Sequence, residues 1–253
     1  MLGDNKKILL AFGTRPEIIK LATVIRALEN EGLRDSVLIV NTNQHNELIK
    51  HQINFWKINV DINFQIDDTN YSLTSLLSQT LNQFQQVIDD YPSLEYIMVQ
   101  GDTNTALACS QISYFNRLKL IHIESGLRTN DLYNPFPEEF NRIIASIVAY
   151  HHFAPTELNK KNLLKEGVSP QSISVVGNTI VDALEYAKEQ IGVQSNSAKN
   201  KVIVTIHRRE KSHKCYEDLV KTIKTLKQKL PHLSFIWVSH PNNVELVTQP
   251  VSY

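Results

Sequence analysis

The chain has 253 residues, enough for one large domain or two smaller ones with a substantial core. Its 26 Lys and Arg residues balance 26 Asp and Glu residues, so no overall field favours nucleic acid or an anionic membrane. Cys109 and Cys215 lie far apart without metal-ligand spacing, which predicts reduced thiols in a cytoplasmic protein. The apolar run near the N-terminus is too short for a membrane span and has no cleavage pattern, so it predicts a strand rather than a signal peptide.

Short apolar strands alternate with helical patterns through the first part of the chain. Pro16 at the first helical position and Gly32 after the last one bound the first helix. The predicted strands cover residues 7–12, 36–42, 96–99, 118–123 and 150–154, and helical spacing covers residues 73–88, a segment ending at 115, and 140–148. Strands separated by helices indicate a parallel sheet covered on both faces, which is a doubly wound α/β domain.

A second α/β pattern follows an apolar run at residues 173–176. Gly177-Asn178-Thr179 interrupts the pattern, and the predicted order is then a helix at 180–191, a linker at 192–200, a strand at 202–206, a helix at 216–230 and a strand at 235–238. One strand, helix and strand cannot cover both faces of a sheet. We therefore expect a complete N-terminal domain at residues 1–175 and an incomplete second domain at residues 176–253.

The segment from His122 to Arg142, HIESGLRTNDLYNPFPEEFNR, is a long and highly charged connection between a predicted strand and a predicted helix. Its charged side chains are Glu124, Arg128, Asp131, Glu138, Glu139 and Arg142. Loops of this length between packed elements are uncommon unless they are functional. This segment is therefore the candidate active-site segment.

Three predicted strands end in turns that carry glycine and charge. These turns are Gly13-Thr14-Arg15, Gly101-Asp102-Thr103 and Glu124-Ser125-Gly126. Each turn alone is more simply explained by turn formation or helix capping, and Asp102 could cap the helix that follows it. Ligands of doubly wound sheets bind outside the carboxyl ends of strands, so the three turns together favour one binding cleft.

Common nucleotide-binding and hydrolase motifs are absent from the sequence, and so is a set of histidines with metal-ligand spacing. A phosphate site made from helix N-termini and arginines remains, and Arg15 at the start of the first helix can meet a phosphate. Lys20 by itself is more simply explained by a surface ion pair with Glu17. His207 after a strand is equally well explained as a phosphate donor or general acid and as a capping or core histidine, whereas His151 and His152 favour a structural role.

Six segments resemble, in order, the motifs of the non-hydrolysing UDP-N-acetylglucosamine 2-epimerases. They are FGTRPEIIK at residues 12–20, GDTNT at 101–105, ESGLRT at 124–129, PFPEEFNR at 135–142, GNTIVDAL at 177–184 and HRRE at 207–210. The resemblance implies a GT-B-like pair of Rossmann-type domains that close over a UDP-sugar, with residues 176–253 beginning the UDP-binding domain. It also implies a homodimer without a cofactor that interconverts UDP-N-acetylglucosamine and UDP-N-acetylmannosamine for cell-envelope polysaccharide synthesis.

The C2 hydrogen of the sugar is not acidic, so elimination and re-addition of UDP is a more accessible route than direct deprotonation. Such a reaction needs two acid/base groups on opposite faces and cationic support for the leaving diphosphate. The resemblance places the acidic groups at Asp102, Glu124 and Glu138, and the cationic groups at Arg15, Lys20 and His207. We take Glu124 and Glu138 as the proton-transfer pair and Asp102 as an orienting or stabilising group.

The chain departs from the family pattern in two places. Complete family members continue through a glycine-rich DSGG segment and a glutamate that bind UDP, and nothing in this sequence matches them. Some bacterial members also bind a second UDP-N-acetylglucosamine as an activator, and Gln44, Arg209 and His240 resemble its contacts. Glu47 and Asn70 stand where an amide and an arginine are expected, so we predict weak or absent activation.

Two other functions fit the same motifs. One is a hydrolysing epimerase or a GT-B glycosyltransferase, which would release free N-acetylmannosamine or transfer the sugar. The other is a non-catalytic UDP-sugar-binding remnant, which would fold but would not exchange the C2 hydrogen with solvent. Product analysis and isotope exchange distinguish these functions.

Overall fold

A computed structural model of the chain describes residues 5–44, 46–67, 72–192, 200–205 and 213–238. The chain divides into two compact units, Met1–Gln190 and Ile191–Tyr253. Within the described residues, no helix has both the length and the apolar character needed to cross a membrane.

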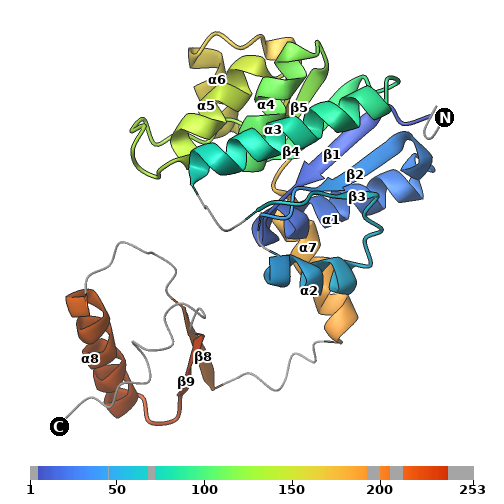
Figure 1. The fold of residues 1–253 in the computed structure, drawn as a ribbon. Coiled ribbons are helices and arrows are strands. Elements are labelled where there is room, and N and C mark those ends of the chain that lie inside the picture. The colour runs from blue at the N-terminus through green and yellow to red at the C-terminus, as the bar shows by residue number, and fades with distance from the viewer. Residues whose placement is uncertain (1–4, 45, 68–71, 193–199, 206–212, 239–253) are drawn as a thin grey trace. The chain divides into compact units, whose positions relative to one another are not determined.

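The N-terminal unit is built on a parallel sheet that has seven strands within the described residues, in the order β3-β2-β1-β4-β5-β6-β7 (Figure 1). The strands are β1 (Ile8–Phe12), β2 (Val37–Asn41), β3 (Ile62–Asn63), β4 (Tyr96–Gln100), β5 (Lys119–Ile123), β6 (His151–Ala154) and β7 (Ile173–Val175). Strand order runs outward in opposite directions from β1 and β4. The switch point between these two strands is where doubly wound sheets bind ligands.

Helices cover both faces of this sheet (Figure 1). They are α1 (Arg15–Asn30), α2 (Asn46–Trp56), α3 (Leu73–Asp90), α4 (Asn104–Phe115), α5 (Glu138–Val148), α6 (Glu157–Lys165) and α7 (Thr179–Ile191), with short 3-10 turns at η1 (Arg34–Ser36) and η2 (Pro170–Ser172). Alternate residues of β1 enter different cores, because successive side chains of a strand point to opposite faces. Leu9 packs with Phe84 of α3, and Leu10 packs with Ile18 of α1. The predicted doubly wound α/β fold is confirmed.

Helices α2 and α6 and strand β3 were absent from the sequence prediction. Ile49 and Trp56 are the fully buried residues among those of α2 whose side chains are described, and Leu163 is the buried residue of α6. Helices with such a narrow apolar stripe have weak periodicity. Strand β3 has two residues, too few to produce a pattern.

Cys109 is a free thiol, as predicted, and lies fully buried in α4. Burial raises the pKa of the Cys109 thiol well above its usual value, with a smaller contribution from the carboxyl of Glu17. The thiol is therefore protonated and unreactive at neutral pH. The side chain of Cys215 lies outside the described part of the chain.

Helix α7 packs on the N-terminal unit. Its Ala183 is buried in the same core as Trp56, and the rings of Tyr186 and Trp56 stack with their centroids 5.0 Å apart. Arg26 of α1 donates to the Tyr186 hydroxyl at 2.9 Å, and its guanidinium carbon lies 4.1 Å from the centre of that ring. These contacts fix α7 against α1 and α2. The domain boundary at residue 175 stays a prediction.

The C-terminal unit contains β8 (Lys201–Thr205), α8 (His213–Lys229) and β9 (Ser234–Val238) among its described residues. The two strands pair in parallel, with Lys201 opposite Ser234. Val202 and Phe235 are half-buried on one face of these strands, and Ile203, which is 69% exposed, and Ile236, which is 44% exposed, lie on the other face. Apolar side chains on both faces are typical of a parallel sheet that is covered by two layers.

The turn between β1 and α1 is tightly packed around Gly13. A Cβ atom at this position would lie 2.0 Å from Oγ1 of Thr42 and 2.5 Å from Oγ1 of Thr105, and both hydroxyls are buried. We expect G13A to lower the free energy of unfolding by at least about 3 kcal/mol, at the upper end of overpacking costs, in urea titrations. G32A is the control, because its Cβ meets nothing within 4 Å and only its φ of 70° costs about 1 kcal/mol. A smaller loss in G13A than in G32A would contradict the tight turn.

Candidate active site

The three predicted turns meet at the carboxyl edge of the sheet. The amide of Gly101 donates to the carbonyl of Ile123, which joins the ends of β4 and β5. The hydroxyl of Thr103 donates to Oε1 of Glu17 at 2.6 Å, which joins the turn after β4 to the start of α1. Parallel strands end at one edge, so residues far apart in sequence lie side by side there.

Glu124, the first residue after β5, is held by three segments of the chain. Its Oε2 accepts from Nζ of Lys20 at 2.5 Å and from the side-chain amide of Gln100, and its Oε1 accepts from the side-chain amide of Asn178 at 2.7 Å. The side chain is 13% exposed, and its backbone has a φ of 65°. A carboxylate with three donors in a partly buried site has one fixed orientation.

The predicted ion pair between Lys20 and Glu17 is wrong. Glu17 is fully buried and accepts from the backbone amides of Gly13 at 2.9 Å and Thr14 at 2.7 Å. Burial raises the pKa of Glu17, while its hydrogen bonds, the strongest of them from Thr103, lower it. Glu17 is the third residue of α1, so its side chain turns back onto the helix start, and Lys20 reaches Glu124 instead.

Asp102 faces α5 rather than capping α4, so its predicted alternative as a helix cap is wrong. Thr103 is the cap, because its hydroxyl accepts from the amide of Ala106 at 3.2 Å. The Asp102 carboxylate pairs with Arg142, and its carbonyl accepts from the side chain of Asn141 at 2.8 Å. Burial raises the pKa of Asp102, Arg142 opposes this rise, and the carboxylates of Glu138 and Glu124 add to it. Glu124 and Glu138 therefore both lie within electrostatic range of Asp102.

The adjacent residues Glu138 and Glu139 have different environments at the start of α5. Glu139 is fully buried, accepts from the amides of Thr129 at 2.9 Å and Asn130 at 3.0 Å, and lies 3.3 Å from Arg142. Glu138 is half-buried, and no described residue forms a hydrogen bond or ion pair with its side chain. Glu139 thus anchors the candidate segment, while Glu138 is available for a ligand.

Two further contacts fix the middle of the candidate segment against α6. Arg128 forms two hydrogen bonds of 2.7 Å with Glu166, and the carbonyl of Gly126 accepts from Asn159 and Asn162. Arg128 therefore has a structural role, because its guanidinium is bound to the carboxylate of Glu166. Sequence reasoning missed the roles of Gln100, Asn159, Asn162 and Asn178, and no pattern in the sequence marked them. It also missed Asn141, although its position three residues after Glu138 on the same helix was a usable signal.

Buried histidines support the turns from within the sheet. Nε2 of His122 lies 2.7 Å from the carbonyl oxygen of Gly101, and Nδ1 of His152 lies 2.9 Å from the hydroxyl of Ser125. Burial lowers the pKa of each imidazole to about 4, so both rings are neutral at pH 7. Since a carbonyl can only accept, the proton of His122 is on Nε2. These roles agree with the structural role expected for His152.

The remaining predicted site residues are less constrained. Arg15 is half-exposed at the first position of α1, and its side chain has no hydrogen-bond or ion-pair partner among the described residues. Oε1 of Gln44 is buried and also has no partner in the described part of the chain. His207, Arg209, His240 and Asn70 lie outside the described residues, and so does the side chain of Glu47.

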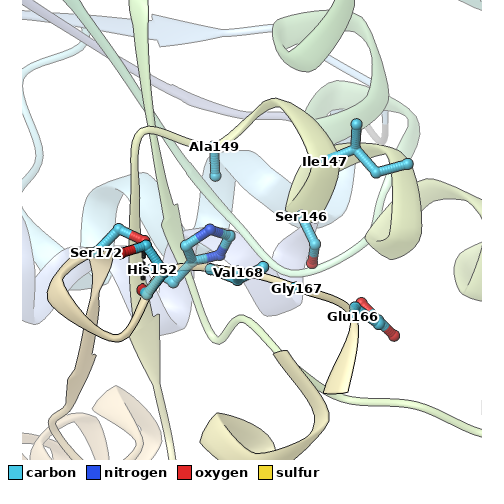
Figure 2. Close-up of a pocket in the computed structure, with 9 residues that line it drawn as sticks. Ser146, Ile147, Ala149, His152, Glu166, Gly167, Val168 and Ser172 are labelled. Carbon is cyan, nitrogen blue, oxygen red and sulfur yellow. Dashed lines mark hydrogen bonds between the residues drawn. The ribbon is translucent and has the colours of Figure 1, made fainter. Parts of the chain in front are cut away.

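Two pockets have none of Asp102, Glu124 and Glu138 among their lining residues. Figure 2 shows the first, of about 310 Å³, which lies near the end of α5, the start of β6 and the loop before β7 and therefore at the amino edge of the sheet. His152, Glu166 and Ser172 are among its lining residues. The second, of about 450 Å³, lies beside the ends of β2 and β3 and includes Asn41 and Lys50. Among the described residues, no group of three or more His, Cys, Asp or Glu side chains could hold a metal ion.

Comparison with known proteins identifies the family. The family model described as UDP-N-acetylglucosamine 2-epimerase matches residues 26–251. The chain belongs to this family. It is 34% identical over 259 residues to the UDP-N-acetylglucosamine 2-epimerase of Yersinia pestis, covering 97% of this chain and 68% of that enzyme.

A solved structure extends this similarity to the fold. The UDP-GlcNAc 2-epimerase from Neisseria meningitidis bound to UDP-GlcNAc superposes with a TM-score of 0.84 at 33% identity, over 94% of this chain and 67% of that one. The predicted GT-B-like α/β fold class and the predicted family are therefore confirmed. The chain spans 63% of the length of a curated relative from Clostridium acetobutylicum, to which it is 35% identical.

The neutral state of His122 gives a pH prediction. Its pKa is lower in the folded chain, at about 4, than its ordinary value of 6.5, so unfolding takes up a proton between these values. Its contribution to stability is complete above pH 6.5 and is lost as the pH falls to about 4. H122Q keeps an amide donor for Gly101 but cannot titrate. Urea titrations should show the stability difference, wild type minus H122Q, rising with pH across this window by at most about 1.4 kcal/mol per pH unit. A difference independent of pH would contradict a buried neutral imidazole.

Proposed function

We propose that this chain acts as a UDP-N-acetylglucosamine 2-epimerase, an isomerase that interconverts UDP-N-acetylglucosamine and UDP-N-acetylmannosamine. The observation that supports this most strongly is the group of three carboxylates, Asp102, Glu124 and Glu138, at the switch point of the sheet, beside cationic groups on α1. Family membership supplies the substrate class. Carboxylates that differ in their partners can take different protonation states, which acid/base chemistry requires.

The proposed reaction removes and restores one proton at C2. A base takes the C2 proton, the bond between C1 and the diphosphate oxygen breaks, and a C1–C2 double bond forms as UDP leaves. An acid then delivers a proton to the opposite face of C2, and UDP adds back to C1. Departure of the diphosphate develops positive charge at C1, which makes the C2 proton easier to remove. No net oxidation occurs, so no redox partner is needed.

Roles follow from the contacts of each residue. Glu124, near the start of the candidate segment, is a fixed, ion-paired carboxylate, and Glu138, near the end of that segment, has no partner among the described residues, so we assign them as the proton-transfer pair. Asp102, paired with Arg142, orients or stabilises the sugar. Arg15 and Lys20 on α1, with His207, support the departing diphosphate.

We also propose that the chain functions in the cytoplasm as a homodimer without nucleic-acid or membrane partners. The buried free thiol of Cys109 is compatible with a reducing compartment. Tyr114 and Phe115, at the end of α4, are each 70% exposed, and exposed aromatic side chains favour self-association.

Incubation with UDP-N-acetylglucosamine in heavy water tests the proposal. The wild-type chain should incorporate deuterium at C2 and form the epimeric UDP-sugar. E124Q and E138Q should each slow deuterium incorporation by about 100-fold or more, because each removes one acid/base group. E189Q, on an exposed position of α7, is the matched control and should keep the wild-type rate.

Four outcomes would count against this proposal. Normal exchange in both E124Q and E138Q would overturn the assignment of the proton-transfer pair. Release of free N-acetylmannosamine with UDP would indicate a hydrolysing enzyme, and transfer of the sugar to an acceptor would indicate a glycosyltransferase. A folded wild-type chain that incorporates no deuterium would favour the non-catalytic UDP-sugar-binding alternative.

A further inference from the structure

We propose that Asn178 is a positioning residue for the epimerase reaction, which orients the carboxylate of Glu124 from the start of α7. The inference rests on the proposed function and deepens it. Asn178 lies in the segment after β7, and its side-chain nitrogen donates to Oε1 of Glu124 at 2.7 Å. The two residues are 54 positions apart in the chain.

The direction of this hydrogen bond is fixed by a second contact. Oδ1 of Asn178 accepts from the backbone amide of Ile180 at 3.0 Å, at the beginning of α7. An asparagine amide has one acceptor end and one donor end. Since the acceptor end is used at the helix start, the donor end must face Glu124. Asn178 can therefore bind Glu124 only while the Glu124 oxygen that faces it is an acceptor.

The helix that carries Asn178 is itself held in place. Tyr186, two turns further along α7, stacks on Trp56 and accepts a hydrogen bond from Arg26. Gly177, directly before Asn178, has a φ of 82°, which a side chain would disfavour. The contacts of Tyr186 therefore hold the helix, and the two hydrogen bonds of the Asn178 side chain leave its amide little freedom to move.

Asn178 donates to the carboxylate oxygen of Glu124 that Lys20 and Gln100 do not contact. Both of those donors contact Oε2, whereas Oε1 accepts from Asn178. The terminal torsion of a glutamate is soft, so a carboxylate held at one oxygen can still rotate. A second anchor fixes the carboxylate plane. Because the donor is a neutral amide, it does so without adding a second cation beside the proposed base.

Two substitutions separate this role from simple helix capping. Serine and aspartate both cap helices well, so N178S and N178D keep an acceptor for Ile180. N178S shortens the side chain and removes the amide nitrogen that donates to Glu124, and N178D replaces that nitrogen with a carboxylate oxygen. N116S is the matched control: Asn116 donates to Gln85 at 3.1 Å and to the carbonyl of Ile112 at 3.0 Å, at the opposite end of α4 from Asp102.

The experiment measures kcat and KM for C2 deuterium exchange in wild type, N178S, N178D and N116S across a range of pH. We expect N178S to lower kcat on the order of 10²-fold with a similar KM, because the proposed base is misaligned rather than lost. N178D should lower kcat further and move the acidic limb of the pH profile upward, because a neighbouring carboxylate favours the protonated form of an acid. N116S should keep the wild-type kcat and pH profile.

The results separate failure of this inference from failure of the proposed function. If wild type exchanges the C2 hydrogen, E124Q does not, and N178S and N178D both match wild type, the positioning role is wrong while the function stands. Equal losses in N178S and N116S would reduce Asn178 to a structural residue and would also overturn the inference. If the folded wild type shows no exchange, the proposed function fails and the positioning role fails with it.

Discussion

The arrangement of the site depends on the hydrogen bonds that three segments of the chain donate to the carboxylate of Glu124. This carboxylate binds Lys20 from α1, Gln100 from the end of β4 and Asn178 from the start of α7. A carboxylate that is mostly removed from water is costly unless charged or polar groups satisfy it. The three segments must therefore meet at one place, and the parallel order of the sheet brings them there.

A second network fixes the other carboxylates relative to the first. Arg142 of α5 pairs with both Asp102 and Glu139, so it joins the turn after β4 to the candidate segment. Glu139 closes this network by binding the backbone of Thr129 and Asn130, and Glu138 remains open. The two successive glutamates thus have different roles: Glu139 anchors the segment, and Glu138 is available for a ligand. They differ because neighbouring positions on a helix point in different directions. The carboxylates of the site owe their different chemistry to these different partners.

Much of the framework was predictable from the sequence because a strand of a parallel sheet that is buried on both faces is a nearly continuous apolar run. The meeting of the turns followed, since parallel strands end at one edge. The partner of Lys20 was predicted wrongly, because helical spacing points to Glu17 but gives no sign that Glu17 is buried at the helix start. The amides of Gln100 and Asn178 were missed for a different reason. A neutral amide in a turn has no charge or periodicity that marks its partner, and these partners lie 24 and 54 residues away.

The pairing of Lys20 with Glu124 is tested most directly by a double-mutant cycle on the free energy of unfolding, with K20M, E124Q and the combined variant. K20M leaves a partly buried carboxylate without its cation, whereas the combined variant leaves two neutral side chains. The structure predicts that K20M is less stable than the combined variant and that the coupling energy is at least about 1 kcal/mol. Costs that add to within about 0.3 kcal/mol would show that the two side chains act independently, and would contradict a site organised around the Glu124 carboxylate.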